Sequence, residues 1–205
     1  MKTLKWSLFG FFAIGVGLYP LAYVLADMKG GLLSSKPAEV LANQIWYAAF
    51  YLHILPGGLA LLVGWTQFSQ KLRNKRMGLH RKLGFLYILM VMVSGLAGLF
   101  IALYATGGSI AQVGFALLAI SWLFTTTMAL KTVKAKDIRG HEHWMIRSYA
   151  LCFAAVTLRI WLPLFTGALG MDFITAYLII AWLCWVPNLA VAEMIVRRKR
   201  RASMG

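Results

Sequence analysis

The sequence predicts an all-α membrane protein, a polytopic helical bundle of six transmembrane helices that forms a single integral membrane domain over residues 1–205. Three observations predict it. Sixty per cent of the 205 residues are hydrophobic. Apolar runs recur along the chain, each close to the roughly 20 residues that a helix needs to cross a bilayer. The 21 Lys and Arg residues gather in alternate connections between these runs.

The apolar runs mark six spans and leave no room for a soluble domain. They cover residues 6–26, 45–68, 83–104, 110–130, 144–164 and 173–196. Each run is expected to be helical, because lipid offers the backbone no hydrogen-bond partners. Short connections, one of them around Gly107-Gly108, join successive spans as antiparallel neighbours. Spans two to five are therefore expected to form a four-helix core, with spans one and six packed beside it.

The distribution of charge predicts orientation and argues against nucleic acid as the partner of a chain whose net charge is +15. Of the 21 cations, 18 flank the spans on one side, Lys29 and Lys36 lie on the other, and Arg159 lies within a span. This positive-inside pattern predicts a bacterial inner-membrane protein with both termini cytoplasmic. The basic connections are also expected to attract anionic lipids, at about 1 kcal/mol per residue near the surface.

The first span has two interpretations. Lys2, Lys5, the apolar stretch and Val24-Leu25-Ala26 resemble a signal peptide with its cleavage site. However, the stretch is longer than the roughly 7–15 apolar residues of a signal peptide, which favours retention as a membrane helix. Cleavage would leave five spans in the same orientation.

Arg159 is predicted to lie inside the membrane with no acid to pair with it. The only other charge in its span is Arg147, near the start, and none of the six acids lies in the middle of an apolar run. An intramembrane cation costs at least about 2.5–3.5 kcal/mol on insertion scales, which makes Arg159 a candidate functional residue. The alternative is a snorkelling side chain that extends toward the outer headgroups or Asp172.

His53 is the second candidate in the outer half of the bundle. At 1.5 Å per residue it lies about 12 Å from the outer end of its span, and Arg159 lies about 8–10 Å from the end of its own. A facing imidazole and guanidinium at similar depth would make a donor-rich pocket suited to an anion, so His53 and Arg159 are the predicted ligand-binding residues. Small residues on the face of His53, such as Gly57 and Gly64, allow close helix packing or leave room for a flat cofactor.

The other three histidines, His80, His141 and His143, gather at the cytoplasmic ends of spans three and five. On a helix His141 and His143 point about 200° apart, so only one of them can face the interior. His141 is favoured, because it shares a small and polar stripe with Ser148, Cys152, Ala155 and Arg159. Histidine is the commonest metal ligand and also an axial ligand of haem. His80 and His141 are therefore predicted metal or haem b ligands and Arg147 a partner for haem propionates, the alternative being histidines that are merely solvated.

Several of these segments resemble a bacterial membrane-protein family known as domain of unknown function 2306. The resemblance covers roughly residues 45–165 and places His141, not His143, at the family position. It implies a membrane bundle but no activity. The layout is similar in outline to that of four-helix b-type cytochromes, although the outer half here offers one histidine instead of two. The segments are His53, Gly57, Gly64 and Gln67-Phe68; His80-Arg81-x-x-Gly84-x-x-Tyr87; His141-x-x-Trp144-Met145-Ile146-Arg147-Ser148-Tyr149-Ala150; and Ala155-Val156-Thr157-Leu158-Arg159.

Three functions follow from these residues. A haem-binding or quinone-reactive redox protein would use His80 and His141. A binding or transport protein for an anionic amphiphile would use His53 and Arg159. A structural or accessory membrane subunit would use its polar residues only to hold helices together. No dinucleotide, phosphate-loop or C-x-x-C signature is present, so no class of enzyme is predicted.

Overall fold

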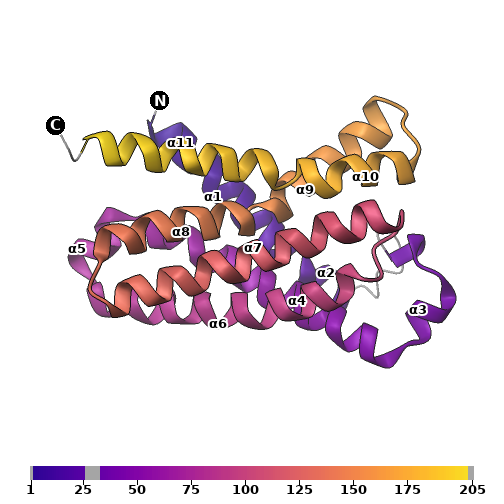
Figure 1. Cartoon of the computed structure of the whole chain (residues 1–205), viewed down its shortest axis with the longest axis horizontal. Coiled ribbons are helices and arrows are strands. Elements are labelled where there is room, and N and C mark those ends of the chain that lie inside the picture. Colours follow the sequence, from indigo (N-terminus) through magenta and orange to yellow (C-terminus); the bar gives the residue numbers. More distant parts are fainter. Residues whose placement is uncertain (1, 26–32, 203–205) are drawn as a thin grey trace.

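The computed structural model describes the backbone of residues 2–25 and 33–202, with side chains from residue 6 onward. These residues form helices and connections without a strand (Figure 1), and six segments are long and apolar enough to cross a membrane. The six are Trp6–Leu25, Gln44–Phe68, Met77–Ala102, Ser109–Lys134, Ile138–Ala168 and Phe173–Ala202. The predicted polytopic helical bundle is confirmed. Ala26, the end of the first predicted span, lies outside the described residues.

Four of the six spans contain more than one helical segment. The first contains α1 (Lys2–Leu18) and α2 (Pro20–Leu25), and the second α4 (Gln44–Gly64) and the 3-10 turn η2 (Trp65–Phe68). The third and fourth are α6 (Met77–Ala102) and α7 (Ser109–Lys134). The fifth contains α8 (Ile138–Cys152), α9 (Ala154–Pro163) and the π-helical η3 (Leu164–Ala168), and the sixth α10 (Phe173–Leu183) and α11 (Val186–Ala202). The connections hold η1 (Leu33–Ser35), α3 (Ala38–Ala42) and α5 (Gln70–Lys75).

Helices α4, α6, α7 and α8 form the predicted four-helix core. Helix α4 packs on α6 and α8, and α7 packs on the same two helices from the other side. Close approach depends on small residues. A Cβ at Gly64 of α4 would collide with the rings of Tyr87 and Tyr149, and one at Gly98 of α6 would lie 2.7 Å from Nδ1 of His53. These glycines thus serve helix packing.

Hydroxyl groups join three of the core helices at mid-depth. Ser148 of α8, which is fully buried, shares hydrogen bonds with Tyr87 of α6 (2.8 Å) and Thr126 of α7 (2.6 Å). Trp122 Nε1 of α7 donates to the Tyr87 hydroxyl at 3.5 Å. The network satisfies polar groups that would otherwise be costly to bury, and it closes the middle of the core.

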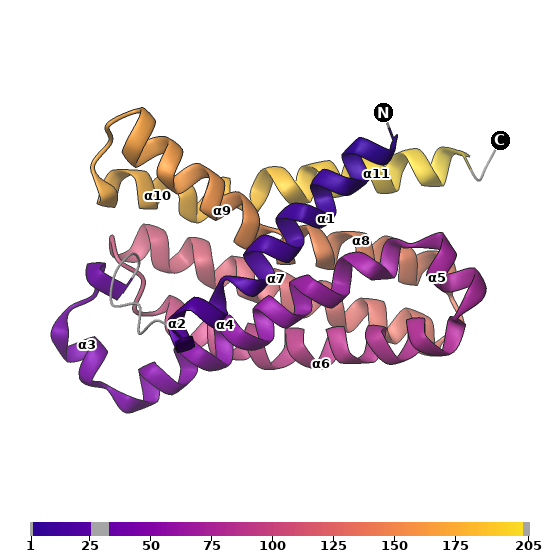
Figure 2. The same ribbon diagram turned by 180° about the vertical axis from the view of Figure 1, so that it is seen from behind.

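The fifth and sixth spans are both broken, and polar side chains pin the two breaks together. Phe153 separates α8 from α9. Asn188 Nδ2 donates to Ala150 O (3.3 Å), Thr157 Oγ1 (3.1 Å) and Cys184 O (2.9 Å), and Thr157 Oγ1 also donates to Cys184 O. These bonds supply donors to carbonyl oxygens near each break, because the membrane interior offers them no water. Beyond the breaks α9 and α10 form a hairpin that rises from the core, while α11 returns over α8 (Figures 1 and 2).

Two core helices begin before their predicted spans. Helix α6 begins at Met77 and α8 at Ile138, each six residues ahead of the predicted starts at 83 and 144. The apolar runs stop at the first cluster of charges, whereas a helix continues into the headgroup region. Consequently His80 and His141 lie on the first turns of helices.

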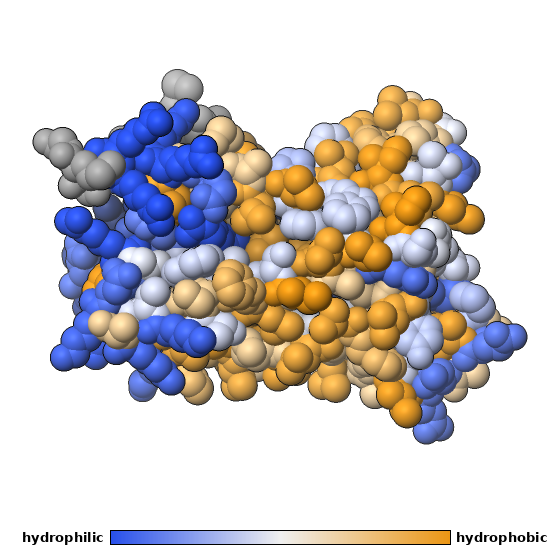
Figure 3. Space-filling view, in the orientation of Figure 1, coloured by the Kyte–Doolittle hydropathy of each residue, from blue (hydrophilic) through white to orange (hydrophobic). Residues whose placement is uncertain are grey.

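The bundle has two chemically different ends. The basic end contains α5, the connection between α7 and α8, the start of α1 and the last part of α11 (Figures 1 and 2). Hydrophilic side chains gather over this end, while apolar side chains cover much of the remaining visible face (Figure 3). The loop end, opposite, contains η1, α3 and the turn between α9 and α10.

The variant Ser148→Ala is expected to destabilise the protein by about 1–3 kcal/mol, because the buried Tyr87 hydroxyl loses a hydrogen-bond partner. Thermal unfolding in detergent measures the loss. Ser109→Ala is the control, since Ser109 lies exposed at the start of α7. Equal stabilities of the two variants would contradict the role of the network.

Candidate functional site

A cavity of about 230 Å³ lies in the half of the bundle toward the loop end. Every span contributes to its walls, which are mostly apolar. Three basic side chains also line it: Lys36 from the loop end, His53 from α4 and Arg159 from α9. Among the described residues, no carboxylate lines the cavity. This combination of basic groups and apolar walls suits an anion that carries an apolar part.

His53 is held in place by Ser94 of α6. Its Nδ1 donates to Ser94 O at 2.9 Å, and Ser94 Oγ donates to His53 O at 2.7 Å. A carbonyl oxygen only accepts, so the proton is assigned to Nδ1 and Nε2 is the ring nitrogen that a ligand can use. The reciprocal bonds orient the imidazole on the cavity wall.

Arg159 also lines the cavity, and its guanidinium is only partly paired. Nη1 donates to Ala155 O at 2.9 Å, one turn back on the same helix, and the guanidinium carbon lies 4.6 Å from the centre of the Tyr19 ring. Its Nε is buried and has no hydrogen-bond partner among the described residues. The side chain therefore faces the cavity and Tyr19 with hydrogen-bonding capacity to spare.

Asp172, the predicted snorkelling partner of Arg159, has another role. Its Oδ1 accepts a hydrogen bond from the Thr175 backbone N–H at 2.9 Å and caps the start of α10. Hydrogen bonds from Thr175 hold the pKa of this carboxyl below its usual range.

Lys36 is a cavity residue that sequence reasoning missed. Its Nζ donates to Tyr104 O, and the neighbouring Ser35 hydroxyl shares a hydrogen bond with Thr106 Oγ1 at 3.2 Å. These contacts fix the loop-end segment over the connection between α6 and α7. Burial lowers the pKa of the Lys36 ammonium to about 8. The sequence offered one signal for Lys36: it is one of only two cations predicted for that side of the membrane.

His80 and His141 lie outside this cavity, at the basic end. His141 Nδ1 donates to Ala129 O at 2.8 Å, whereas His80 Nδ1 is buried without a partner among the described residues. No group of three or more His, Cys, Asp or Glu side chains in the described ranges is arranged to hold a metal ion.

The residues around the two histidines do not fit a haem. His80 and His141 stand on α6 and α8, which face each other across the core, so a haem between them needs an open slot there. Tyr87 and Ser148, each seven residues or about 10 Å along the same helices, hydrogen-bond directly across that gap. Near His80, the buried amide of Gln67 fills the space beside Gly84. The haem interpretation of His80 and His141 therefore gains no support from the geometry.

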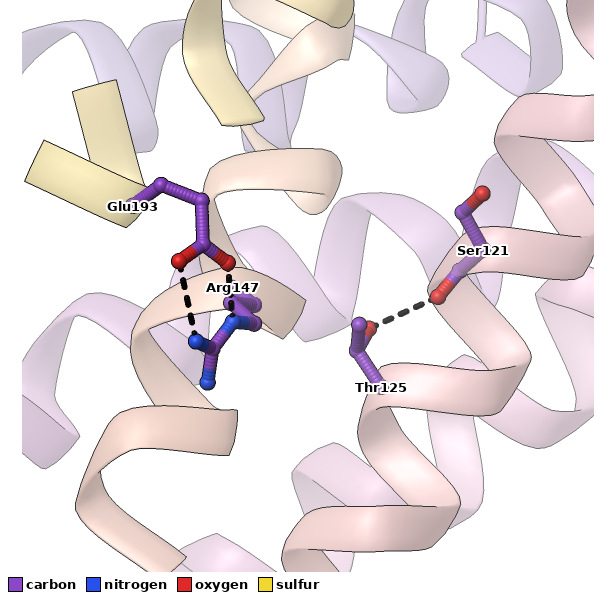
Figure 4. Close-up of polar contacts among 4 residues, drawn as sticks. All are labelled: Ser121, Thr125, Arg147 and Glu193. Carbon is purple, nitrogen blue, oxygen red and sulfur yellow. Dashed lines mark hydrogen bonds and ion pairs between the residues drawn. The ribbon is translucent and has the colours of Figure 1, made fainter. Parts of the chain in front are cut away.

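Arg147, the predicted propionate partner, is engaged with Glu193 of α11. Its Nε donates to Glu193 Oε1 and its Nη2 to Oε2 at 3.0 Å (Figure 4). The guanidinium carbon also lies 4.6 Å from the Trp144 ring centre. Arg147 is 9% exposed. The bidentate pair ties α8 to α11. The other contact in Figure 4, from Thr125 Oγ1 to Ser121 O at 2.8 Å, stays within α7.

Glu193→Ala is expected to lower stability by about 1–3 kcal/mol, because the buried Arg147 guanidinium loses its charged partner. Glu142→Ala is the matched control. Its pair with Lys199 (2.8 Å) is exposed, and such pairs contribute about 0–1 kcal/mol. Thermal unfolding of both variants measures the difference, and equal shifts would refute a structural role for the Arg147 pair.

Comparison with known proteins identifies one family. A family model described as "Predicted membrane protein (DUF2306)" matches residues 50–196. The match extends beyond the predicted limit near residue 165 and includes most of the sixth span. It contains His53 and Arg159 but not Lys36. No curated protein and no solved structure matches the chain.

Proposed function

The chain belongs to the DUF2306 family of membrane proteins, and we propose that it binds an anionic amphiphile in the cavity lined by Lys36, His53 and Arg159. The observation that carries the proposal is the buried Nε of Arg159, which has no hydrogen-bond partner among the described residues. No carboxylate among these residues lines the cavity. Burying an unpaired guanidinium is costly, and a bound anion would offset that cost.

The basic groups favour a carboxylate or phosphate as the anionic part. A guanidinium presents its donors in a planar fork that matches both groups. Nη1 of Arg159 donates to Ala155 O, whereas Nε has no acceptor among the described residues. Lys36 adds a second cation, whereas His53, with its proton on Nδ1, has Nε2 left as an acceptor. The chemistry of this donor set therefore selects for negative charge.

The walls favour an amphiphile over an inorganic ion. Most of the lining is apolar, including Phe50, Leu118 and Trp122. A volume of about 230 Å³ lies below the roughly 300–1,000 Å³ of pockets for drug-sized ligands. It accommodates an anionic group with a short apolar chain.

Binding is favoured over passage through the core. Trp122 lines the cavity and also donates to Tyr87, so the Tyr87–Ser148–Thr126 network lies directly beneath the cavity on the side of the basic end. This packed layer supports a receptor-like site rather than a channel. In our proposal the basic end is cytoplasmic and the protein lies in the inner membrane, in keeping with the 18 cations on that side.

Arg159→Leu is expected to weaken binding of octanoate by about tenfold or more, because a charge-assisted pair is lost. Arg159→Lys should recover part of the affinity, since lysine keeps the charge but lacks the fork. Calorimetry on protein purified in a neutral detergent measures both variants. Octanol, the neutral analogue, should bind the parent protein more weakly than octanoate does.

Arg139→Leu is the control for this experiment, since Arg139 is an exposed cation at the basic end. It should leave octanoate affinity unchanged. Equal binding of octanoate to the parent protein and to Arg159→Leu would refute the site.

Octanoate affinity is expected to be constant below about pH 8 and to fall above it, by up to about tenfold per pH unit, as Lys36 loses its proton. A carboxylate stays ionised throughout this range, and Arg159 stays charged. Lys36→Arg should remove the pH dependence because guanidinium does not titrate there. The same profile in Lys36→Arg and the parent protein would show that another group is responsible.

A further inference from the structure

A second hollow lies at the basic end of the bundle, separate from the cavity of Arg159. It is a groove of about 950 Å³ between α1 and α11, which we term the α1/α11 groove. Helix α1 packs on α4 and α9, and α11 packs on α8 and α10, so a face of α8 is left as the floor between them. Figure 2 shows α1 crossing this side of the molecule.

The floor and walls of the α1/α11 groove are apolar and aromatic. Phe9 of α1 packs on Phe153, which follows α8, and on Tyr149 of α8, with ring centres 5.2 and 5.6 Å apart. Phe68 packs on Tyr149 at 5.4 Å. Val191 of α11 lines the opposite wall with its side chain exposed. Packed rings make this a preformed surface, which lowers the entropic cost of holding a flexible chain.

The length of the groove matches one leaflet of a bilayer. From Glu142 at its mouth to Phe153 at its far end, the floor runs eleven residues along α8, about 16 Å at 1.5 Å per residue. Half of a hydrocarbon core of roughly 30 Å is about 15 Å. A transmembrane helix of a partner protein would need contacts over twice that length. The dimension therefore favours a lipid acyl chain as the occupant.

The mouth of the groove carries positive charge that is only partly neutralised. Lys199 pairs with Glu142, whereas Arg73 donates from Nη1 to Gln67 O at 2.9 Å and makes no ion pair with a described residue. Other cations lie nearby on α5 and at the end of α11. The backbone carbonyl holds the Arg73 guanidinium at the mouth while its other donors remain available to an anion.

We propose that the α1/α11 groove binds one anionic phospholipid, with its phosphate at Arg73 and an acyl chain along Tyr149 and Phe153. Basic side chains supply the charge that complements the headgroup, and the apolar floor supplies a surface of acyl-chain length. The proposal does not rest on the cavity at the other end of the bundle.

Native mass spectrometry of the purified full chain with dioleoylphosphatidylglycerol tests the proposal, with dioleoylphosphatidylcholine as the neutral comparison. We expect one retained phosphatidylglycerol per protein and weaker retention of phosphatidylcholine. Arg73→Gln should weaken phosphatidylglycerol binding by at least about fivefold. Arg76→Gln, which removes an exposed cation at the end of the same helix but outside the groove, should leave it unchanged.

The acyl-chain half of the site has its own variant. Val191→Trp places a large side chain in the groove from an exposed position, so it should reduce phosphatidylglycerol binding while the charge at the mouth stays the same. Equal binding to the parent protein, Arg73→Gln and Val191→Trp would reduce the interaction to general charge attraction and overturn the proposal. A protein dimer that phosphatidylglycerol does not displace would also overturn it, because a second copy would then occupy the groove.

Discussion

Inside a bilayer, a backbone carbonyl that leaves its helix must find a donor within the protein, and the shape of this bundle depends on how that requirement is met. The fifth and sixth spans each break, between Cys152 and Ala154 and between Leu183 and Val186. Asn188 reaches both breaks, with bonds to Ala150 O and Cys184 O, and its third bond joins it to Thr157 Oγ1. Two breaks that would each be costly alone thus stabilise each other. A side chain from one span donates to carbonyl oxygens that the break in the other span leaves without a helical partner. The two spans therefore bend as a unit.

The paired breaks explain why the two halves of the bundle differ. Toward the basic end α8 stays in the core, and Ser148 bonds to Tyr87 and Thr126 across a closed interior. Past Phe153, α9 leaves the core with α10, and the space it vacates is bounded by residues of every span. His53 and Arg159 line that space. The cavity is therefore a consequence of the helix break, and the close packing below it gives the cavity a floor.

Much of this architecture could be predicted from composition and periodicity, because the bilayer constrains length and polarity so strongly. The six spans and the four-helix core needed only apolar runs and the rise of a helix. The break at Phe153 could not be predicted, since no proline or glycine marks it and its stabilising partner, Asn188, lies 35 residues further on. The pairing of Arg147 with Glu193 is equally non-local. Because nothing in the sequence indicates this ion pair, the sequence predicted a haem propionate as the partner of Arg147. Lys36 was missed because a single lysine in a loop carries no periodic signal.

The two arginines of the fifth span differ in how their charges are paired. Arg147 lies near the basic end with a bidentate carboxylate and an aromatic face, so its donors are matched and its charge is neutralised. Arg159, twelve residues further on, has an aromatic face and one backbone carbonyl, and its buried Nε has no partner among the described residues. The residue type, the span and the aromatic contact are the same, so what differs is the missing anion. Glu193 neutralises the first guanidinium, whereas the second faces an apolar cavity with its charge available. This difference favours ligand binding over snorkelling as the role of Arg159.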